Sequence, residues 1–539
     1  MAEKVIKNNE SIAPFFGERM SFIRGLDPLG LQNISDATFS KLLPGLNNVT
    51  GRVRYYSFYC WLLDSYSKEN GNTNPEHQKQ FIRRAEYIIA LAAPFFSNDS
   101  TSIPGSNYAK NEVNRKEQTV HSLQDGTYKK DGTTRDTYWN YSWGAFGQYY
   151  LGSLRDIGII SARGKEDRIY IRTNDRGNEI VSGELLANAF DQNIADAKKR
   201  LFLDSIKEGH ITEDELQDLL PDFNLTKIPK ETKEEKLLTK LLLQKDYPLR
   251  EEEIPVRLRN KTIKHLFNFL KDGIPEFSDR AFVVDCYDKK GKISNKEDES
   301  LMGWYFYQFN EYWHYANTSI LHGTLSLLDK NVGLNWLSLP ELVNEVKDAV
   351  IEKYIALDLI RTGDDTVVDL LTKLTDSYSE DANLENTNNN TLGEKVAYAF
   401  LLIFSLFINN QKQLGELSNY VAENGLTGDG EGTAYFFQQF HEKKKHSIGD
   451  FIYDYIYLNI IYRHQYVAFR KMRGSNQSTQ KFIIEDQYIR YLGNFNAAFT
   501  GPRINNLMSF LQDLNVVTDN HDLSERGLLI LKNMEDGNN

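Results

Sequence analysis

Basic residues gather in one stretch of the chain, residues 461–503, where cationic side chains and aromatic rings alternate. The cations are Arg463, Arg470, Lys471, Arg473, Lys481, Arg490 and Arg503. Only Glu485 and Asp486 oppose them, which leaves a local charge of +5 (seven minus two) in a chain of net charge −12. Tyr462 and Tyr466 lie between the cations. Cations neutralise phosphates and rings stack on bases, so this basic segment predicts nucleic-acid binding. The alternative left open is that the cations pair with acidic surfaces of the same chain or of a partner subunit.

Residue spacings that suit metal ions are incomplete in this sequence. Glu311 and His314 have the Glu-x-x-His spacing of carboxylate-bridged di-iron bundles, but no second such pair falls on an expected helix, so we expect a core histidine. Asp222 and Glu231-x-Lys233 match the residue types of a metal-dependent nuclease motif. That chemistry needs acids on adjacent strands that hold Mg²⁺ together, whereas here a loop and a charged helix start are expected. No cofactor, bound metal or covalent nucleophile is predicted.

Composition indicates a mainly helical protein. The 539 residues include 30 Tyr and 30 Phe but 13 Pro, which suits long helices that pack rings between them. Cys60 and Cys286 are far apart, so no disulfide framework is available. The first twenty residues have no apolar run after their lysines and do not read as a secretory signal, so we expect a cytoplasmic protein. The longest uncharged apolar stretch, residues 396–408, is shorter than the roughly 20 residues that span a membrane, so it predicts a buried helix.

Residues 152–181 predict a helix end, a strand, a charged turn, a second strand and the start of another helix. The second strand alternates, with Ile169 and Ile171 on one face and Tyr170 and Arg172 on the other, as in a strand with one wet face. Two helices are expected earlier in the chain, one from a cap at Thr50 and one with Pro75 in its first turn.

An internal echo repeats the first part of this pattern near the end of the chain. The phrase SLRDIGII, residues 153–160, aligns with FLQDLNVV, residues 510–517. Each is followed by a polar turn and an Arg-Gly pair, at Arg176-Gly177 and at Arg526-Gly527. The repeat predicts the same order of helix, apolar strand, turn and helix twice. In the second copy, almost no residues are left for a second strand between the turn and the last helix.

In layout, residues 138–190 resemble winged-helix domains, and residues 500–534 resemble a minimal version. The resemblance implies a DNA contact through a helix and through wing cations, which here are Arg163, Lys165 and Arg168. Acidic residues beside these cations reduce the local positive charge. We therefore expect the first wing to bind protein, and the basic segment beside the second copy to bind nucleic acid. The arrangement also resembles bridging subunits of chromosome-organising ATPase complexes. Phrases such as GLDPLG and HQYVAFRK resemble uncharacterised bacterial proteins encoded among antiphage defence genes.

The expected fold is mainly α and multidomain, with helical bundles, two winged-helix-like modules and little β structure outside the wing. The predicted segments are an N-terminal helical domain (1–100), a winged-helix-like domain with a polar insertion (101–192), a helical connector (193–300), an aromatic-rich helical domain (301–445), and a long basic helix with a minimal winged helix (446–539).

The predicted function is a non-enzymatic nucleic-acid-binding or scaffold subunit of a bacterial multiprotein system, with a protein partner and no membrane association. Two alternatives stay open. One is a metal-dependent nuclease whose site is assembled from distant residues, and the other is a protein-interaction module that bridges an ATPase complex.

Overall fold

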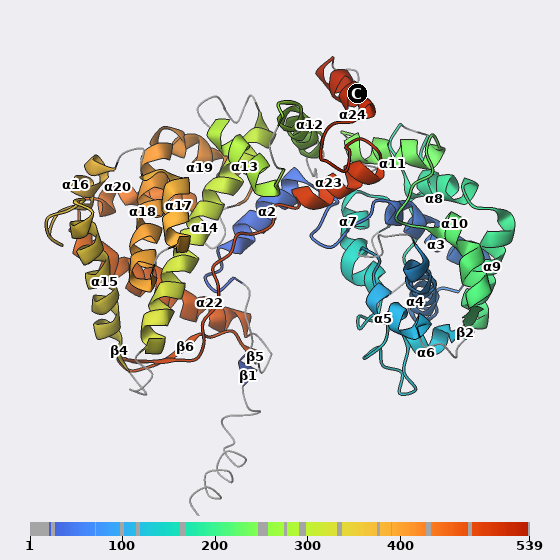
Figure 1. Ribbon diagram of the computed structural model, residues 1–539, viewed down its shortest axis with the longest axis horizontal. Helices are drawn as coiled ribbons and strands as arrows, with labels where there is room; N and C mark the ends of the chain where they lie inside the picture. Colours follow the sequence, from blue (N-terminus) through green and yellow to red (C-terminus); the bar gives the residue numbers. More distant parts are fainter. Residues whose placement is uncertain are drawn as a thin grey trace, which may run out of the picture. The chain divides into compact units, whose positions relative to one another are not determined.

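Helices dominate the computed structural model (Figure 1), which confirms the predicted mainly α, multidomain fold with little β structure. It describes residues 21–22, 27–70, 72–96, 102–114, 119–161, 169–177, 179–245, 257–273, 277–289, 298–330, 337–374, 378–389, 391–426, 433–472 and 477–536. The chain divides into two compact units, each built from separate stretches. Unit 1 comprises residues 1–38, 287–298 and 302–500, and unit 2 comprises residues 39–286, 299–301 and 501–539. The five predicted segments stay a prediction.

Unit 1 is a bundle of helices with two small sheets. Its helices include α14 (Glu299–Lys330), α15 (Leu339–Ala356), α16 (Val367–Lys373), α17 (Glu380–Asn389), α18 (Leu392–Asn410), α19 (Leu414–Glu423), α20 (Thr433–Lys443), α21 (Ile448–Asp454), η6 (Tyr455–Tyr462) and α22 (Arg463–Lys471). Strands β6 (Phe482–Glu485) and β7 (Tyr488–Tyr491) form an antiparallel hairpin, and β4 (Leu337–Ser338) pairs with the other edge of β7. Strand β1 (Ser21–Phe22) pairs in parallel with β5 (Gln477–Ser478). Helices α2 (Gln32–Leu42), α13 (Asp279–Asp288) and α14 have residues in both units.

Helix α18 forms the centre of the unit 1 core. It packs against α15 and α17, and the residues from Val396 to Phe407 are almost all buried. This confirms the prediction that the apolar stretch 396–408 is a buried helix. Burial of so many large side chains stabilises the unit by about 1.5–3 kcal/mol per residue before entropy is counted. Within the part of the chain that the structure describes, no helix combines the length and apolarity that crossing a membrane requires.

Unit 2 is mainly helical in its described residues. Its elements are α3 (Arg54–Asn70), α4 (Pro75–Ala92), η1 (Ala93–Phe95), α5 (Ser106–Val113), α6 (Leu123–Thr127), η2 (Phe146–Tyr150), α7 (Leu151–Asp156), α8 (Gly183–Gln192), α9 (Asp196–Glu208), α10 (Glu213–Phe223), α11 (Lys233–Leu243), α12 (Arg257–Lys271), α13 (Asp279–Asp288), α23 (Ile504–Asp513) and α24 (Glu525–Glu535), with the short pair β2 (Val120–Ser122) and β3 (His210–Thr212). Aromatic rings fill its core, where Trp61 of α3 packs on Phe190, Phe202 and Phe223.

The two helix starts predicted near the N-terminus have different outcomes. Pro75 lies in the first turn of α4 after an Asn74 cap, as predicted. The predicted cap at Thr50 is wrong, because α3 begins at Arg54. The backbone amide of Thr50 instead donates to the Asn47 side chain at 2.9 Å, which forms a separate turn ahead of the helix.

The internal echo has the same backbone geometry in both copies. Gly158 and Asn515 both adopt left-handed φ angles, of 72° and 55°, directly after α7 and α23. The next amide then donates back into the helix, from Ile159 N to Leu154 O at 3.1 Å and from Val516 N to Leu511 O at 2.8 Å. An isolated antiparallel bridge follows in each copy, Ile160 with Arg172 and Val517 with Leu523. The predicted repeat of helix, short extended segment and helix is therefore confirmed. The likeness to winged-helix domains stays a prediction.

The two Arg-Gly pairs that follow the repeated phrases do not occupy equivalent positions in the structure. Gly527 lies inside α24, and a Cβ added there would lie 2.3 Å from the carbonyl oxygen of Val516. Gly177 lies in an open turn with nothing within 4 Å. The residue that matches Gly527 is Gly183 of α8, where an added Cβ would lie 2.1 Å from the carbonyl oxygen of Ile159. In both copies the second helix lies so close to the carbonyl oxygen of the first extended residue that the helix position facing it has no room for a Cβ atom and must be glycine.

The strand predicted over residues 169–172 is an extended segment with a single isolated bridge at Arg172, and its side chains alternate with Tyr170 turned inward. Tyr170 is buried against Trp143 and Phe146, whereas Ile171 is exposed. The reason is that Gln78 of α4 holds the backbone of Tyr170, accepting from its amide at 2.8 Å and donating to its carbonyl at 2.7 Å. Arg172 lies on the same side and pairs with Asp64 at 3.0 Å.

Alanine at Gly183 is expected to destabilise unit 2 by about 1–3 kcal/mol, because the added methyl group overlaps a backbone oxygen that cannot move aside easily. The matched control is Gly152→Ala in α7, where nothing lies within 4 Å. There the substitution stabilises by about 0.4–1 kcal/mol through the unfolded chain. Urea denaturation of both variants checks the opposite signs, and an equal effect would contradict the close approach.

Candidate binding site

A turn near the N-terminus, residues 27–30, is held against α22 by three side chains of that helix. Arg463 donates from Nε to the carbonyl oxygen of Leu29 at 2.8 Å, and Lys471 donates from Nζ to the carbonyl oxygen of Asp27 at 2.6 Å. His464 Nδ1 lies 2.9 Å from the carbonyl oxygen of Pro28. The phrases DPLG and HQYVAFRK, more than four hundred residues apart, therefore meet in unit 1.

His464 links this turn to the start of β6. Its Nε2 accepts the backbone amide of Lys481 at 3.0 Å, so Nδ1 is the nitrogen that donates to Pro28. Burial lowers the pKa of His464 to about 4, which keeps the ring neutral. The imidazole is therefore a structural connector between the turn and the strand.

The basic residues predicted to bind nucleic acid have different environments. Arg463 and Lys471 hold the 27–30 turn, and Lys481 is buried. Arg470 lies 5.8 Å from the ring of Tyr466, and Arg490 is exposed on β7. These five residues belong to unit 1.

The remaining predicted residues lie elsewhere. Arg503 belongs to unit 2, where its guanidinium lies 3.6 Å from the centre of the Phe39 ring and donates to the carbonyl oxygen of Leu46 at 2.7 Å. Arg163, Lys165, Arg168 and Arg473 lie outside the described residues. The basic segment therefore contributes to two separate units.

Four large apolar side chains are exposed along one side of η6 and α22, and we call them the α22 stripe. They are Leu458, Tyr462, Tyr466 and Phe469, and between 43% and 56% of each is exposed. Their spacing of four, four and three residues places them on one helical face. An isolated exposed ring needs no explanation, but a continuous stripe of this kind marks an interaction surface.

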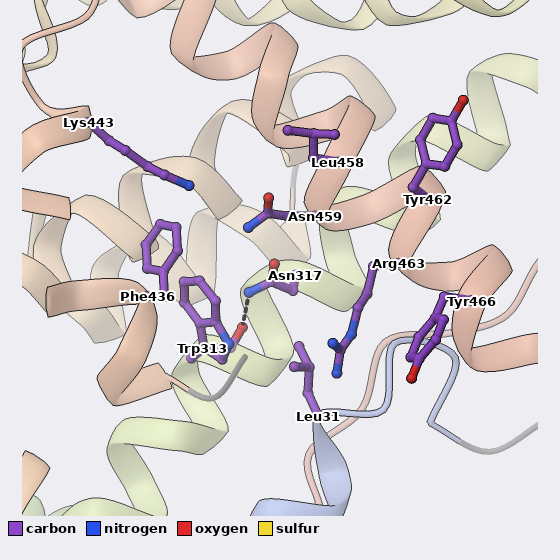
Figure 2. Close-up of a pocket in the computed structure, with 10 residues that line it drawn as sticks. All are labelled: Leu31, Trp313, Asn317, Phe436, Lys443, Leu458, Asn459, Tyr462, Arg463 and Tyr466. Carbon is purple, nitrogen blue, oxygen red and sulfur yellow. Dashed lines mark hydrogen bonds between the residues drawn. The ribbon is translucent and has the colours of Figure 1, made fainter. Parts of the chain in front are cut away.

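A cavity of about 350 Å³ opens beside the stripe (Figure 2). Its lining comes from the residue before α2 and from α14, α20, η6 and α22, and consists of Leu31, Trp313, Asn317, Phe436, Lys443, Leu458, Asn459, Tyr462, Arg463 and Tyr466. In Figure 2 the Lys443 ammonium group and the Asn459 amide extend toward the same space, and Arg463 lies on the opposite side of the view. Two cations and four aromatic rings therefore share one cavity.

The polar groups of the cavity favour a ligand that accepts hydrogen bonds. None of the ten lining residues is acidic. The Nε1 of buried Trp313 has no hydrogen-bond acceptor among the described residues. Asn317 donates to the carbonyl oxygen of Trp313 at 2.8 Å and accepts from Tyr455 at 2.7 Å. Lys443 lies 5.5 Å from the centre of the Phe436 ring. A negatively charged ligand with a flat ring matches this lining.

Burial lowers the pKa of Arg463, although the nearby carboxylate of Asp27 opposes the shift. Arginine stays charged even so, because its pKa begins so far above neutrality. The titratable side chains of the lining are Lys443, Arg463, Tyr462 and Tyr466. The arrangement is suited to binding.

The residues considered as metal ligands or nuclease acids lie apart from this cavity. Glu311 is buried and accepts from Ser35 at 2.5 Å and from the amide of Thr500 at 2.6 Å, as expected for a core network. Asp222 lies in the last turn of α10, so the loop expected there is wrong, and Glu231 lies in the turn before α11. Among the described residues, no group of three or more His, Cys, Asp or Glu side chains is arranged to hold a metal ion.

Sequence reasoning identified Tyr462, Tyr466 and Arg463 but missed the other walls of the cavity. Trp313, Phe436 and Asn459 come from three separate helices, so no local spacing connects them. The α22 stripe did carry a signal, because Leu458 and Phe469 continue the helical spacing of the two tyrosines.

Comparison with known proteins gives no match: no protein-family model, no curated protein and no solved structure is similar to this chain.

Proposed function

We propose that this protein binds single-stranded nucleic acid without enzymatic action, through the unit 1 cavity and the adjoining α22 stripe. The observation that carries the proposal is the cavity lining, which combines Lys443 and Arg463 with four aromatic rings and contains no acidic residue. Phosphates provide the negative charge that such a lining favours, and bases provide the flat rings.

Single strands fit better than duplex because stacking on protein rings requires unpaired bases. Tyr466 is more than half exposed and has Arg470 beside its ring, which places a cation next to a stacking surface. The net charge of −12 disfavours general binding to polyanions, so contact must depend on a local surface. We propose a bacterial multiprotein system as the setting, on the resemblance noted from the sequence.

Tyr466→Ala is expected to weaken binding of a fluorescent oligonucleotide of about 20 thymidines by roughly tenfold, because stacking contributes about 1–3 kcal/mol per base. Tyr466→Phe keeps the ring and is expected to stay within about twofold. Fluorescence anisotropy at several salt concentrations measures both variants. The proposal fails if the chain binds no oligonucleotide, or if Tyr466→Ala binds as the unchanged protein does.

Lys443 provides a second readout of the same site. Lys443→Ala is expected to reduce the slope of log affinity against log salt by about 1, since one phosphate contact is lost. Lys412→Ala is the matched control, because Lys412 is exposed in unit 1 and does not line the cavity. A nuclease would instead cut the oligonucleotide in the presence of Mg²⁺. A pure protein-interaction module would not bind the oligonucleotide at any salt concentration.

A further inference from the structure

A groove of about 630 Å³ lies in unit 2 between α11, α24 and residues 179–180. Its apolar surface comes from Ile180, Leu243, Leu529 and Ile530, and Leu529 is 60% exposed. Leu528, the neighbour of Leu529 in α24, is also exposed. Two adjacent exposed leucines on a surface helix favour burial against another molecule.

The rim of the groove is basic. Lys236, Lys240 and Lys245 are exposed on α11 or just after it, and Glu179 is the single acid among the twelve lining residues. Arg526 also lines the groove, but it already pairs with Glu235 and donates to Thr239 at 2.9 Å. Lys236 and Lys240 outnumber Glu179, so this groove is positive in a chain whose net charge is negative.

The lining differs in kind from that of the unit 1 cavity. No aromatic residue is present among the twelve, so bases have nothing to stack on. The apolar groups are aliphatic, and they suit leucine-like side chains. Helices α11 and α24 form most of the groove wall and no β-strand of the described residues borders it, so an extended peptide has no strand edge to pair with.

We propose that this groove docks an amphipathic helix of a partner protein that has leucines on one face and acidic residues beside them. The leucines pack between Leu243 and Leu529, and the carboxylates face Lys236 and Lys240. Lysines four residues apart on α11 match carboxylates spaced by one helical turn. This inference is independent of the proposed nucleic-acid binding, which uses residues of unit 1.

The test uses the full chain and a fluorescein-labelled peptide of about 16 residues, long enough to form a helix on binding. The peptide has leucines at helical spacing and glutamates beside them, and a matched peptide has lysines in place of the glutamates. Anisotropy is expected to show saturable binding of the acidic peptide and at least about tenfold weaker binding of the basic one, because like charges repel. Equal binding of the two peptides, or no binding of the acidic one, overturns the proposal.

Two variants locate the contact. Lys236→Glu with Lys240→Glu is expected to weaken acidic-peptide binding at least about tenfold, and Leu529→Ser about tenfold. Lys110→Glu on α5 is the control for a charge reversal on an exposed lysine of unit 2 away from the groove. Peptide binding that neither groove variant changes overturns the proposal. So does sedimentation that shows a dimer of the chain dissociated by Leu529→Ser, because the groove is then a contact between two copies. Oligonucleotide binding by the same variants is expected to stay unchanged, which separates this result from the function of unit 1.

Discussion

Replacing Glu234 by alanine is expected to lower the free energy of unfolding by about 3–5 kcal/mol, because it leaves a buried charge without its partner. Glu234 and Arg54 are both almost completely buried in unit 2, and Arg54 Nε lies 3.2 Å from Glu234 Oε1. Ser57 donates to the same oxygen at 2.5 Å, and Asn193 donates to the other at 2.6 Å. The substitution therefore breaks several charge-assisted hydrogen bonds at once.

The control for this prediction is an ion pair of the same unit whose carboxylate is exposed. Glu76 lies 2.6 Å from Lys79 at the surface of α4, so Glu76→Ala is expected to cost less than about 1 kcal/mol. Urea denaturation measures both variants. A loss below about 1 kcal/mol for Glu234→Ala would contradict the buried-pair account. The double variant Arg54→Met with Glu234→Met is expected to lose less than the sum of the single changes, since no unpaired charge remains.

The contribution of one buried carboxyl group in unit 1, that of Glu311, to stability is expected to fall as the pH rises from about 4.5 to about 7. Burial raises the pKa of Glu311 from 4.5 to about 7, although the hydrogen bonds from Ser35 and Thr500 oppose the shift. The nearby charge of Asp36 adds to it, and His314 is neutral because burial lowers its pKa. The folded chain thus holds a proton that the unfolded chain releases.

The sign follows from proton binding. Between the two pKa values the folded state binds more protons, so each rise in pH favours unfolding. The pKa shift of Glu311 corresponds to a loss of about 3 kcal/mol in the free energy of unfolding between pH 4.5 and pH 7. Above pH 7 this contribution changes little. Glu311→Gln removes the group, so the difference in stability between this variant and the unchanged protein is expected to vary with pH by that amount. Denaturation series at pH 4.5, 6 and 8 measure it, and a difference that is constant with pH would contradict the raised pKa.

Local patterns in the sequence predicted local structure well. The helix over 396–408 and the two copies of the repeat depend on residues close together in the chain, so apolar spacing and the alignment of two short phrases were enough to find them. The Thr50 cap and the Gly177 match failed because the partners that decide those positions, Asn47 and a carbonyl oxygen, have no signature at the residue itself.

The candidate site could be predicted only in part. Counting cations located the basic segment, but charge count does not show which cations already have partners. Arg463 and Lys471 donate to carbonyl oxygens at the opposite end of the chain, and Arg503 belongs to the other unit. Backbone carbonyls are present at every residue, so no sequence pattern marks the ones that an arginine will use.

The turn at residues 27–30 also sets an order of events during synthesis. Its contact with Arg463 spans 434 residues, so the turn leaves the ribosome long before α22 exists. At about 5–20 residues per second, the wait is roughly 20–90 seconds. Most of unit 2 is translated in that interval, since residues 39–286 follow the turn directly. Unit 1 can therefore complete its fold only near the end of translation, and ribosome-bound chains that stop before residue 463 are expected to leave this turn sensitive to protease.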